Sequence, residues 1–241
     1  MVGQTYIDRV REDGKRVCVV LGEPTDVALN TRLSDAASFN DPAVIYVANG
    51  FKGGDNVQRE GYLAAARVAG MVASADITDS LTHAVVKNAV EVTGALTNAQ
   101  KRQATQSGAL VFSMNARNQV QIEYGITTFI TPTADFDAGW KKIRRMRTRD
   151  ELINRIVYAW DPVLGTINND SEGRATLVAS AQQIMDKMVA EKALRQGSIF
   201  GEDPSHPAQG DSAWFVAQVY DNDSAEHVYI AFAFQFAEAM A

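Results

Sequence analysis

The sequence predicts an α/β (α+β) fold, with a mixed β-sheet flanked by helices and a long β-hairpin at the C-terminal end. Three observations support this prediction. Residues 15–21 and 42–48 are continuous apolar runs rich in valine, which is typical of strands buried on both faces. Residues 138–160 and 171–194 carry apolar side chains at helical spacing. Two apolar β-like runs then flank an Asp-Asn-Asp-Ser turn near the end of the chain.

The first α/β portion, residues 1–95, alternates strand and helix signals. Small side chains dominate its one clear helix, which would let that helix approach a sheet closely. Strand, linker, strand and helix in this order favour a layered α/β arrangement. The expected elements are a helix end at 6–12, strands at 15–21 and 42–48, a glycine-rich loop at 51–56, a helix at 59–75 and a weakly β-like segment at 82–92.

The second portion, residues 96–241, contains the two long helices. Each has an apolar stripe that must be buried against another element, most simply a sheet. In the first helix the stripe consists of Trp140, Ile143, Ile153, Ile156, Val157 and Trp160, and in the second of Leu177, Ala181, Ile184, Met185, Met188 and Val189. The other expected elements are a helix at 96–108 capped by Thr97 or Asn98, a hairpin of 109–113 with 120–124, a loop at 197–211, and a terminal hairpin of 213–220 with 227–236.

The last strand of this terminal hairpin is the first candidate for a functional surface. Its apolar residues alternate with others that are also largely apolar, so both faces of the strand are apolar. A free edge of this kind invites aggregation, which predicts that the strand lies inside a sheet or pairs with another chain. The subunit-interface candidates are Val228, Ile230, Phe232, Phe234 and Phe236.

A run of basic residues on the first long helix is the second candidate. The plainest interpretation is a solvated helix face, partly offset by Asp150 and Glu151. The functional interpretation is a salt-sensitive contact with an acidic partner protein, because no aromatic residues interleave with the cations as they would in a nucleic-acid platform. The candidates for contact with a tube or a neighbouring subunit are Lys141, Lys142, Arg144, Arg145 and Arg147.

Composition excludes several classes of protein. The formal net charge of -6 and a pI of about 5.1 argue against a nucleic-acid partner. The longest run of small residues, 63–75, is interrupted by Arg67 and is too short to cross a membrane. The single cysteine, Cys18, excludes an intrachain disulfide and suits assembly in a reducing cytoplasm.

No motif points to catalysis, a cofactor or a metal. Residues 51–56 share only their glycines with a phosphate-binding loop, and a surface loop explains them better. The Gly-Asp-Ser at 210–212 lacks a supporting histidine motif, so the start of a strand is the better explanation. The histidines, at 83, 206 and 227, are too scattered for a metal site. A small α/β ligand-binding or enzyme domain of unknown substrate stays open as the alternative class.

A set of short segments resembles, in order, the contractile tail sheath proteins of bacteriophages and phage-like particles, in the version found in Gram-positive prophages. REDGKRVCVV at 11–20 is similar to the family's charged turn and strand. The set continues with ARVAGMVASA at 66–75, DSLT at 79–82, ITTF at 126–129, KIRR at 142–145, INND at 167–170, EGR at 172–174 and the final aromatic hairpin. Each motif alone has low specificity, whereas the ordered set covers residues 7–236.

The resemblance implies a structural subunit and no enzyme. Sheath subunits form helical rings around an inner tube and contract to drive the tube through a target cell envelope, and their terminal arms are woven together by strand addition. This implies a helical homo-oligomer, partnered by tail tube, baseplate and tail terminator proteins, in a virion tail assembled in the host bacterial cytoplasm. The terminal strand suits the shared sheet, and the basic run suits an acidic tube or neighbour. Tailocins and extracellular injection systems share these mechanics and stay open as the machine.

The length of the chain differs from that of the family. Sheath subunits are usually about twice as long, and their N-terminal half carries an outer domain and an extended arm. We therefore expect residues 1–241 to be the core domain, with the N-terminal part of the usual subunit missing. A truncated gene, a split subunit or an expressed fragment would each have this form.

Overall fold

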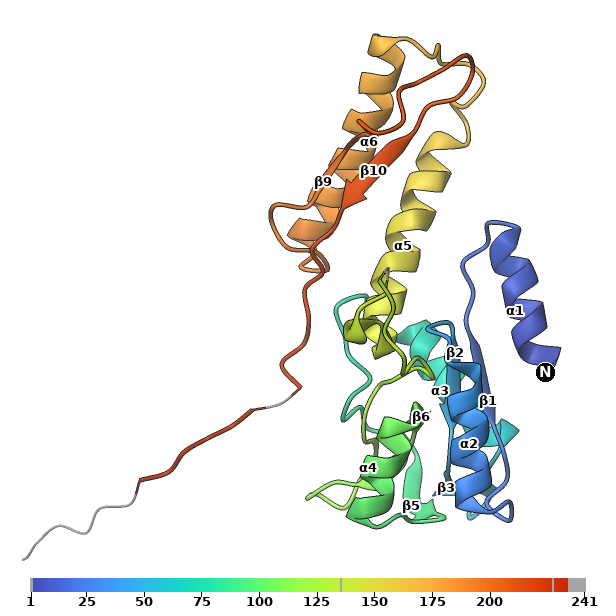
Figure 1. Ribbon diagram of the computed structural model, residues 1–241. Coiled ribbons are helices and arrows are strands. Elements are labelled where there is room, and N and C mark those ends of the chain that lie inside the picture. Colours follow the sequence, from blue (N-terminus) through green and yellow to red (C-terminus); the bar gives the residue numbers. More distant parts are fainter. Residues whose placement is uncertain (1, 135, 227, 234–241) are drawn as a thin grey trace, which may run out of the picture.

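The computed structural model describes residues 2–134, 136–226 and 228–233. Figure 1 shows a body of small sheets and helices, from which a long helix, α5 (Ile143–Trp160), projects. A second long helix, α6 (Ser171–Ala190), runs back beside the projecting part of α5. Residues 219–226 return to the start of α5, and residues 228–233 lead away from the body.

The centre of the body is a parallel sheet of three strands in the order β1 (Val19–Gly22), β2 (Val44–Val47) and β6 (Ala109–Leu110). All four residues of β2 are buried, as the apolar run predicts. Ile45 and Val47 pack with α3 (Tyr62–Ser74) on one face, and Tyr46 packs with α2 (Leu29–Phe39) on the other. β2 and α3 confirm the prediction. β1 is shorter than the strand predicted at 15–21 and is only partly buried, and α2 lies in a stretch to which the sequence assigned no element.

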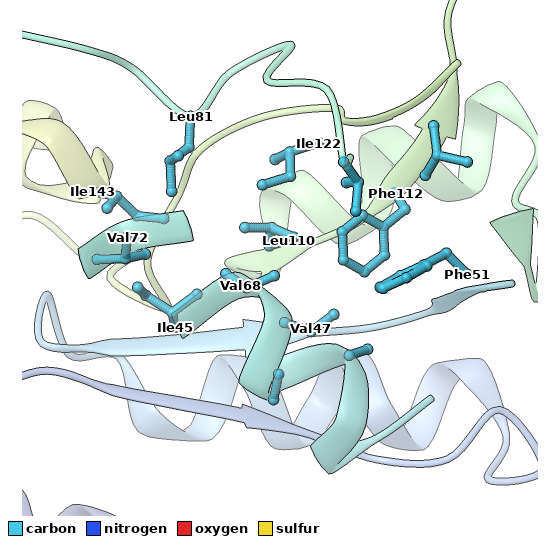
Figure 2. Close-up of a cluster of buried hydrophobic side chains, with 14 of the residues drawn as sticks. Ile45, Val47, Phe51, Val68, Val72, Leu81, Leu110, Phe112, Ile122 and Ile143 are labelled. Atoms are coloured by element: carbon cyan, nitrogen blue, oxygen red, sulfur yellow. The ribbon is translucent and has the colours of Figure 1, made fainter. Parts of the chain in front are cut away.

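The glycine-rich stretch after β2 begins as a strand, so the surface loop expected at 51–56 is reduced to an exposed turn at 54–56. β3 (Gly50–Gly53) pairs antiparallel with β4 (Gln58–Arg59) and β5 (Ala89–Thr93). Phe51 is fully buried and contacts Phe112 edge to face, with the ring centroids 5.3 Å apart (Figure 2). Burial of the Phe51 side chain thus places β3 in the core, although the composition of this stretch is typical of a loop.

The remaining small elements of the body agree with the sequence, with two differences. The predicted hairpin is formed by β7 (Phe112–Met114) and β8 (Val120–Ile122), and the preceding residues pair separately as β6 in the central sheet. α1 (Val2–Glu12) begins earlier than expected. Helix α4 (Asn98–Gln106) starts at Thr97, whose hydroxyl accepts from the Gln100 amide while the Gln100 side chain accepts from the Thr97 amide.

We expect Thr97→Ala to lower the free energy of unfolding by about 1 kcal/mol, because the first turn of α4 loses the acceptor for its free amide groups. Urea unfolding followed by circular dichroism measures this change. Gln103→Ala, on the exposed side of the same helix, is the matched control and should not destabilise the protein. Equal stability of the wild type and Thr97→Ala would contradict the capping role.

Helix α5 joins two cores. Its first turns insert Ile143 and Met146 into the core of the body, where Ile143 lies beside Val72 and Leu81 (Figure 2). Its second half contributes Leu152 to a separate core formed with α6. The predicted stripe on α6 is confirmed, with Leu177, Ala181, Met185 and Met188 buried and Ile184 and Val189 partly buried. The expected helix start at 138 is wrong, because Ala138–Lys141, which includes Trp140, is a separate 3-10 helix and α5 begins at Ile143. On α5 the expected stripe is also wrong at Val157, which is half exposed.

The C-terminal hairpin is present, but its partner strand differs from the prediction. β10 (Phe215–Gln218) pairs antiparallel with β9 (Ile199–Glu202), which lies inside the expected loop 197–211. Phe200 and Phe215 on this hairpin stack on each other and pack against Trp160 of α5. The described residues 228–233 of the expected partner strand have no secondary structure. The contacts of Phe200 and Phe215 with Trp160 favour β9, and not the later apolar run, as the partner of β10.

Candidate assembly surface

The segment of residues 228–233, which we name the arm, exposes the predicted interface side chains. Val228, Ile230 and Phe232 are 71%, 67% and 74% exposed. Phe234 and Phe236 lie outside the described residues. The arm leads away from the body in Figure 1. Large apolar side chains that follow one another in this way mark a surface that another element covers.

The β9–β10 hairpin is a two-stranded sheet with two edges, and the edge of β9 is occupied. The Gln182 side chain on α6 accepts from the Phe200 amide over 2.9 Å and donates to the Ser198 carbonyl over 3.2 Å. A side-chain amide therefore takes the place that the backbone of a further strand would fill.

The edge of β10 has the opposite character. In the antiparallel register Ala217 lies opposite Phe200, whose amide points away from the hairpin toward Gln182. Residues opposite each other share this orientation, so the polar backbone groups of Ala217 also point outward. β10 is an edge strand of the described sheet, and Val216, which precedes Ala217 in this strand, is half exposed. This edge can accept a further strand.

The acidic residues 221–226, which we name the strap, connect β10 to the arm and cross the start of α5. Asp221 contacts Arg145 over 3.0 Å and Asp223 contacts Lys142 over 2.6 Å. Lys142 also contacts Glu226 over 3.3 Å, and Arg144 donates to Ser224 over 2.9 Å. Three of the five candidate cations are therefore paired with the chain's own carboxylates or hydroxyls.

The other two candidate cations also bind within the chain. Lys141 donates to the Thr105 carbonyl, and Arg147 donates to the carbonyl of Asp76 over 3.0 Å. Burial lowers the pKa of Lys141 and the pKa of Arg147. The basic run is thus not a freely solvated face. Its proposed role in contacting a tube or a neighbouring subunit stays a prediction.

The charges of the strap and of Lys142 stabilise one another. Burial acts to lower the pKa of Lys142, but the hydrogen bond and charge of Asp223 and the charge of Glu226 outweigh it and raise the pKa. Burial likewise acts to raise the pKa of Asp223, and the Lys142 hydrogen bond and the charges of Lys142 and Arg144 hold it below its ordinary value. Both groups therefore stay charged over a wider pH range than free side chains.

The described residues contain neither a metal-binding cluster nor a helix that could span a membrane. No group of histidine, cysteine and carboxylate side chains in the described ranges could hold a metal ion. The helices among these residues are each too short or too polar to span a bilayer. A cavity of 420 Å³ lies between the start of α5 and the end of β10, and Arg145 and Arg149 there stack on the ring of Trp140.

The comparison with protein families decides the identity of the chain. Residues 3–128, more than half of its 241 residues, match the family described as the phage tail sheath protein central domain. The chain belongs to the phage tail sheath protein family. This confirms the resemblance seen in the ordered motifs. A search of curated proteins finds no match to this sheath chain.

Solved sheath structures have the same fold. A sheath tail protein from Desulfitobacterium hafniense gives a TM-score of 0.64 at 24% identity, over 82% of this chain and 52% of that one. A sheath tail protein from Listeria innocua gives 0.61 at 18% identity, over 76% and 47%. The contracted PVC sheath complex of an extracellular contractile injection system gives 0.69 at 11% identity, over 88% and 62%. The present sheath chain spans about half the length of the first two proteins.

Sequence reasoning located the arm and the cations but missed their partners. It did not single out Gln182 or the acids of the strap, because it treated residues 221–224 as a turn. The signal that could have found the strap is the spacing of Asp221, Asp223 and Glu226, three acids just before an apolar strand in a chain with one dense basic run.

Proposed function

We propose that this chain is part of a structural, non-enzymatic subunit of a contractile tail sheath, which polymerises around an inner tail tube and contracts to drive the tube through a target cell envelope. Membership of the sheath family carries this proposal. The similar structures include sheath tail proteins and the sheath of an extracellular contractile injection system, so the proposal covers both kinds of machine.

The arm supplies the contact between subunits in this proposal. Its exposed apolar side chains are covered when it adds as a strand to the sheet of a neighbouring copy. The acceptor we propose is the edge of β10, because Gln182 closes the edge of β9. This contact is heterologous, and repetition of a heterologous contact from copy to copy builds an open helical assembly when the rotation between copies does not close a ring.

The basic run has a smaller part in this proposal. Its cations are held within the chain, which favours an internal role over direct contact with an acidic tube for Lys142, Arg144 and Arg145. Lys141 and Arg147 stay candidates for contact with the tube or a neighbouring subunit. The tail tube, the baseplate and the tail terminator are the further partners we propose for the assembled sheath.

We expect Ala217→Pro to block assembly without unfolding the hairpin. Proline removes the amide that points outward from β10, so an incoming strand loses a hydrogen bond and meets the ring. Val216→Pro is the contrasting variant, since its amide faces β9 and its loss should unfold the hairpin. Negative-stain electron microscopy and near-ultraviolet circular dichroism measure assembly and folding. Normal sheaths formed by Ala217→Pro would exclude β10 as the acceptor.

The location of the protein tests the proposed function itself. An antibody raised to this chain is applied with gold label to an induced lysate of the source bacterium. We expect gold along the outer wall of tails in both extended and contracted forms. Tails that are visibly present but carry no gold would overturn the proposal, and a ligand search of the 420 Å³ cavity would then follow.

A further inference from the structure

The strap is bound at both of its ends, first to the end of the helical pair and then to the body. At its start the Asn222 amide donates to the Ala193 carbonyl over 3.1 Å, just after α6. At its end Glu226 contacts Lys142 and accepts from the Ser80 hydroxyl over 2.6 Å. The Glu226 side chain is only 8% exposed, so this contact is well shielded from water. The strap therefore ties the α6 end of the helical pair to the body immediately before the arm begins.

The start of α5 needs the strap for an electrostatic reason. A helix N-terminus carries a partial positive charge, and carboxylates stabilise it. The first turn of α5 contains no acidic residue, Lys142 at the N-cap makes no capping bond, and Arg144 and Arg145 follow it. Arg144 is only 5% exposed, so its charge is costly without a partner. The acids of the strap supply the negative charge that the first turn of α5 lacks.

We propose that Lys142, Arg144 and Arg145 are positioning residues, which form with the strap an ionic latch that fixes where the arm leaves the subunit. This inference rests on the proposed function, in which the arm is donated to a neighbouring copy. Only residue 227 separates the strap from the arm in the sequence, so a bound strap restricts the arm to a small set of directions and reduces the entropy lost on donation. When the ion pairs of the latch are broken, the first residues of the arm are free to change direction.

Hydrogen exchange in the full chain, at a dilution where it is monomeric, tests the latch separately from assembly. We expect Lys142→Glu and Asp223→Lys each to speed exchange of the amides in 219–226 about tenfold or more at low salt, because a charge-assisted bond is lost. The matched control is Lys187→Glu, which makes the same charge change on an exposed part of α6. The control should exchange like the wild type. Unchanged exchange in both latch variants would overturn the latch.

A double-mutant cycle of Lys142→Ala and Asp223→Ala separates pairing from general damage. We expect each single alanine variant to speed exchange and to lower the rate of sheath assembly, and the double variant to show less than the sum of the two effects, because both substitutions remove the same bond. Strictly additive effects on exchange would overturn the pairing. Wild-type assembly rates in single variants with fast exchange would overturn the positioning role. Deletion of residues 228–241 tests donation itself, and assembly that survives this deletion would refute donation, whatever the exchange rates are.

Discussion

Replacing Ile230 and Phe232 together by aspartate is expected to abolish association between copies of the chain and to leave its stability unchanged. Both side chains are about two-thirds or more exposed in the single chain, so they contribute little to folding. Burying an isoleucine and a phenylalanine in a shared sheet stabilises the assembly by about 1.5–3 kcal/mol each. Their loss should weaken association by a factor of at least about one hundred. Sedimentation velocity measures association, and urea unfolding measures stability.

The matched control for this variant is Tyr62→Asp. Tyr62 is also a large exposed side chain, but it lies at the start of α3, away from the arm. We expect this control to associate like the wild type. If it weakens association as much as the double variant does, the effect reports added negative charge and not loss of the arm. If the double variant still associates normally, the arm is not the contact.

The second large effect is expected for Phe51→Ala, which should lower the free energy of unfolding by about 3–5 kcal/mol. The ring of Phe51 is fully buried, and its removal leaves a cavity beside Phe112 in the core of the body. Urea unfolding monitored by tryptophan fluorescence measures the loss. The result also distinguishes a buried strand from a surface loop at Phe51, because a phenylalanine in a surface loop would contribute almost nothing to the free energy of unfolding.

Val57→Ala provides the comparison for this second effect. Val57 lies in the turn between β3 and β4, close to Phe51 in the sequence, and is about half exposed. Its truncation should change stability by less than about 0.5 kcal/mol. Similar small losses for both variants would contradict the burial of β3 and assign residues 51–53 to the surface.

Periodicity in the sequence predicted the elements whose burial follows from local pattern. The continuous apolar run of β2 and the stripe of α6 are such cases, since each pattern depends on which faces of one element are covered. The cap of α4 at Thr97 was also predictable, because the bond that forms it spans three residues. Where α5 lies could not be predicted, because its two halves enter different cores and Val157 falls outside both.

Where a segment has two possible partners in the fold, the sequence did not predict which of them it contacts. The run at 227–236 is more apolar than residues 199–202 and is the candidate partner of β10 by composition. In the structure, however, β10 pairs with residues 199–202. That choice depends on Trp160, which is distant in the sequence and packs against both Phe200 and Phe215. The basic run shows the same limit, because its partners come from α3's flank, α4's end and the strap. Tertiary contacts decide in each case, and composition gives no account of them.

The most direct test of strand donation is disulfide cross-linking in assembled tails. In a Cys18→Ala background, cysteine replaces Ala217 on β10, and a second cysteine replaces each arm residue from 228 to 232 in turn. We predict cross-linked ladders that rise and fall with a period of two along the arm, because alternate residues of a paired strand face its neighbour's side chains. Assembled tails that yield only monomers at every position would contradict donation of the arm to β10.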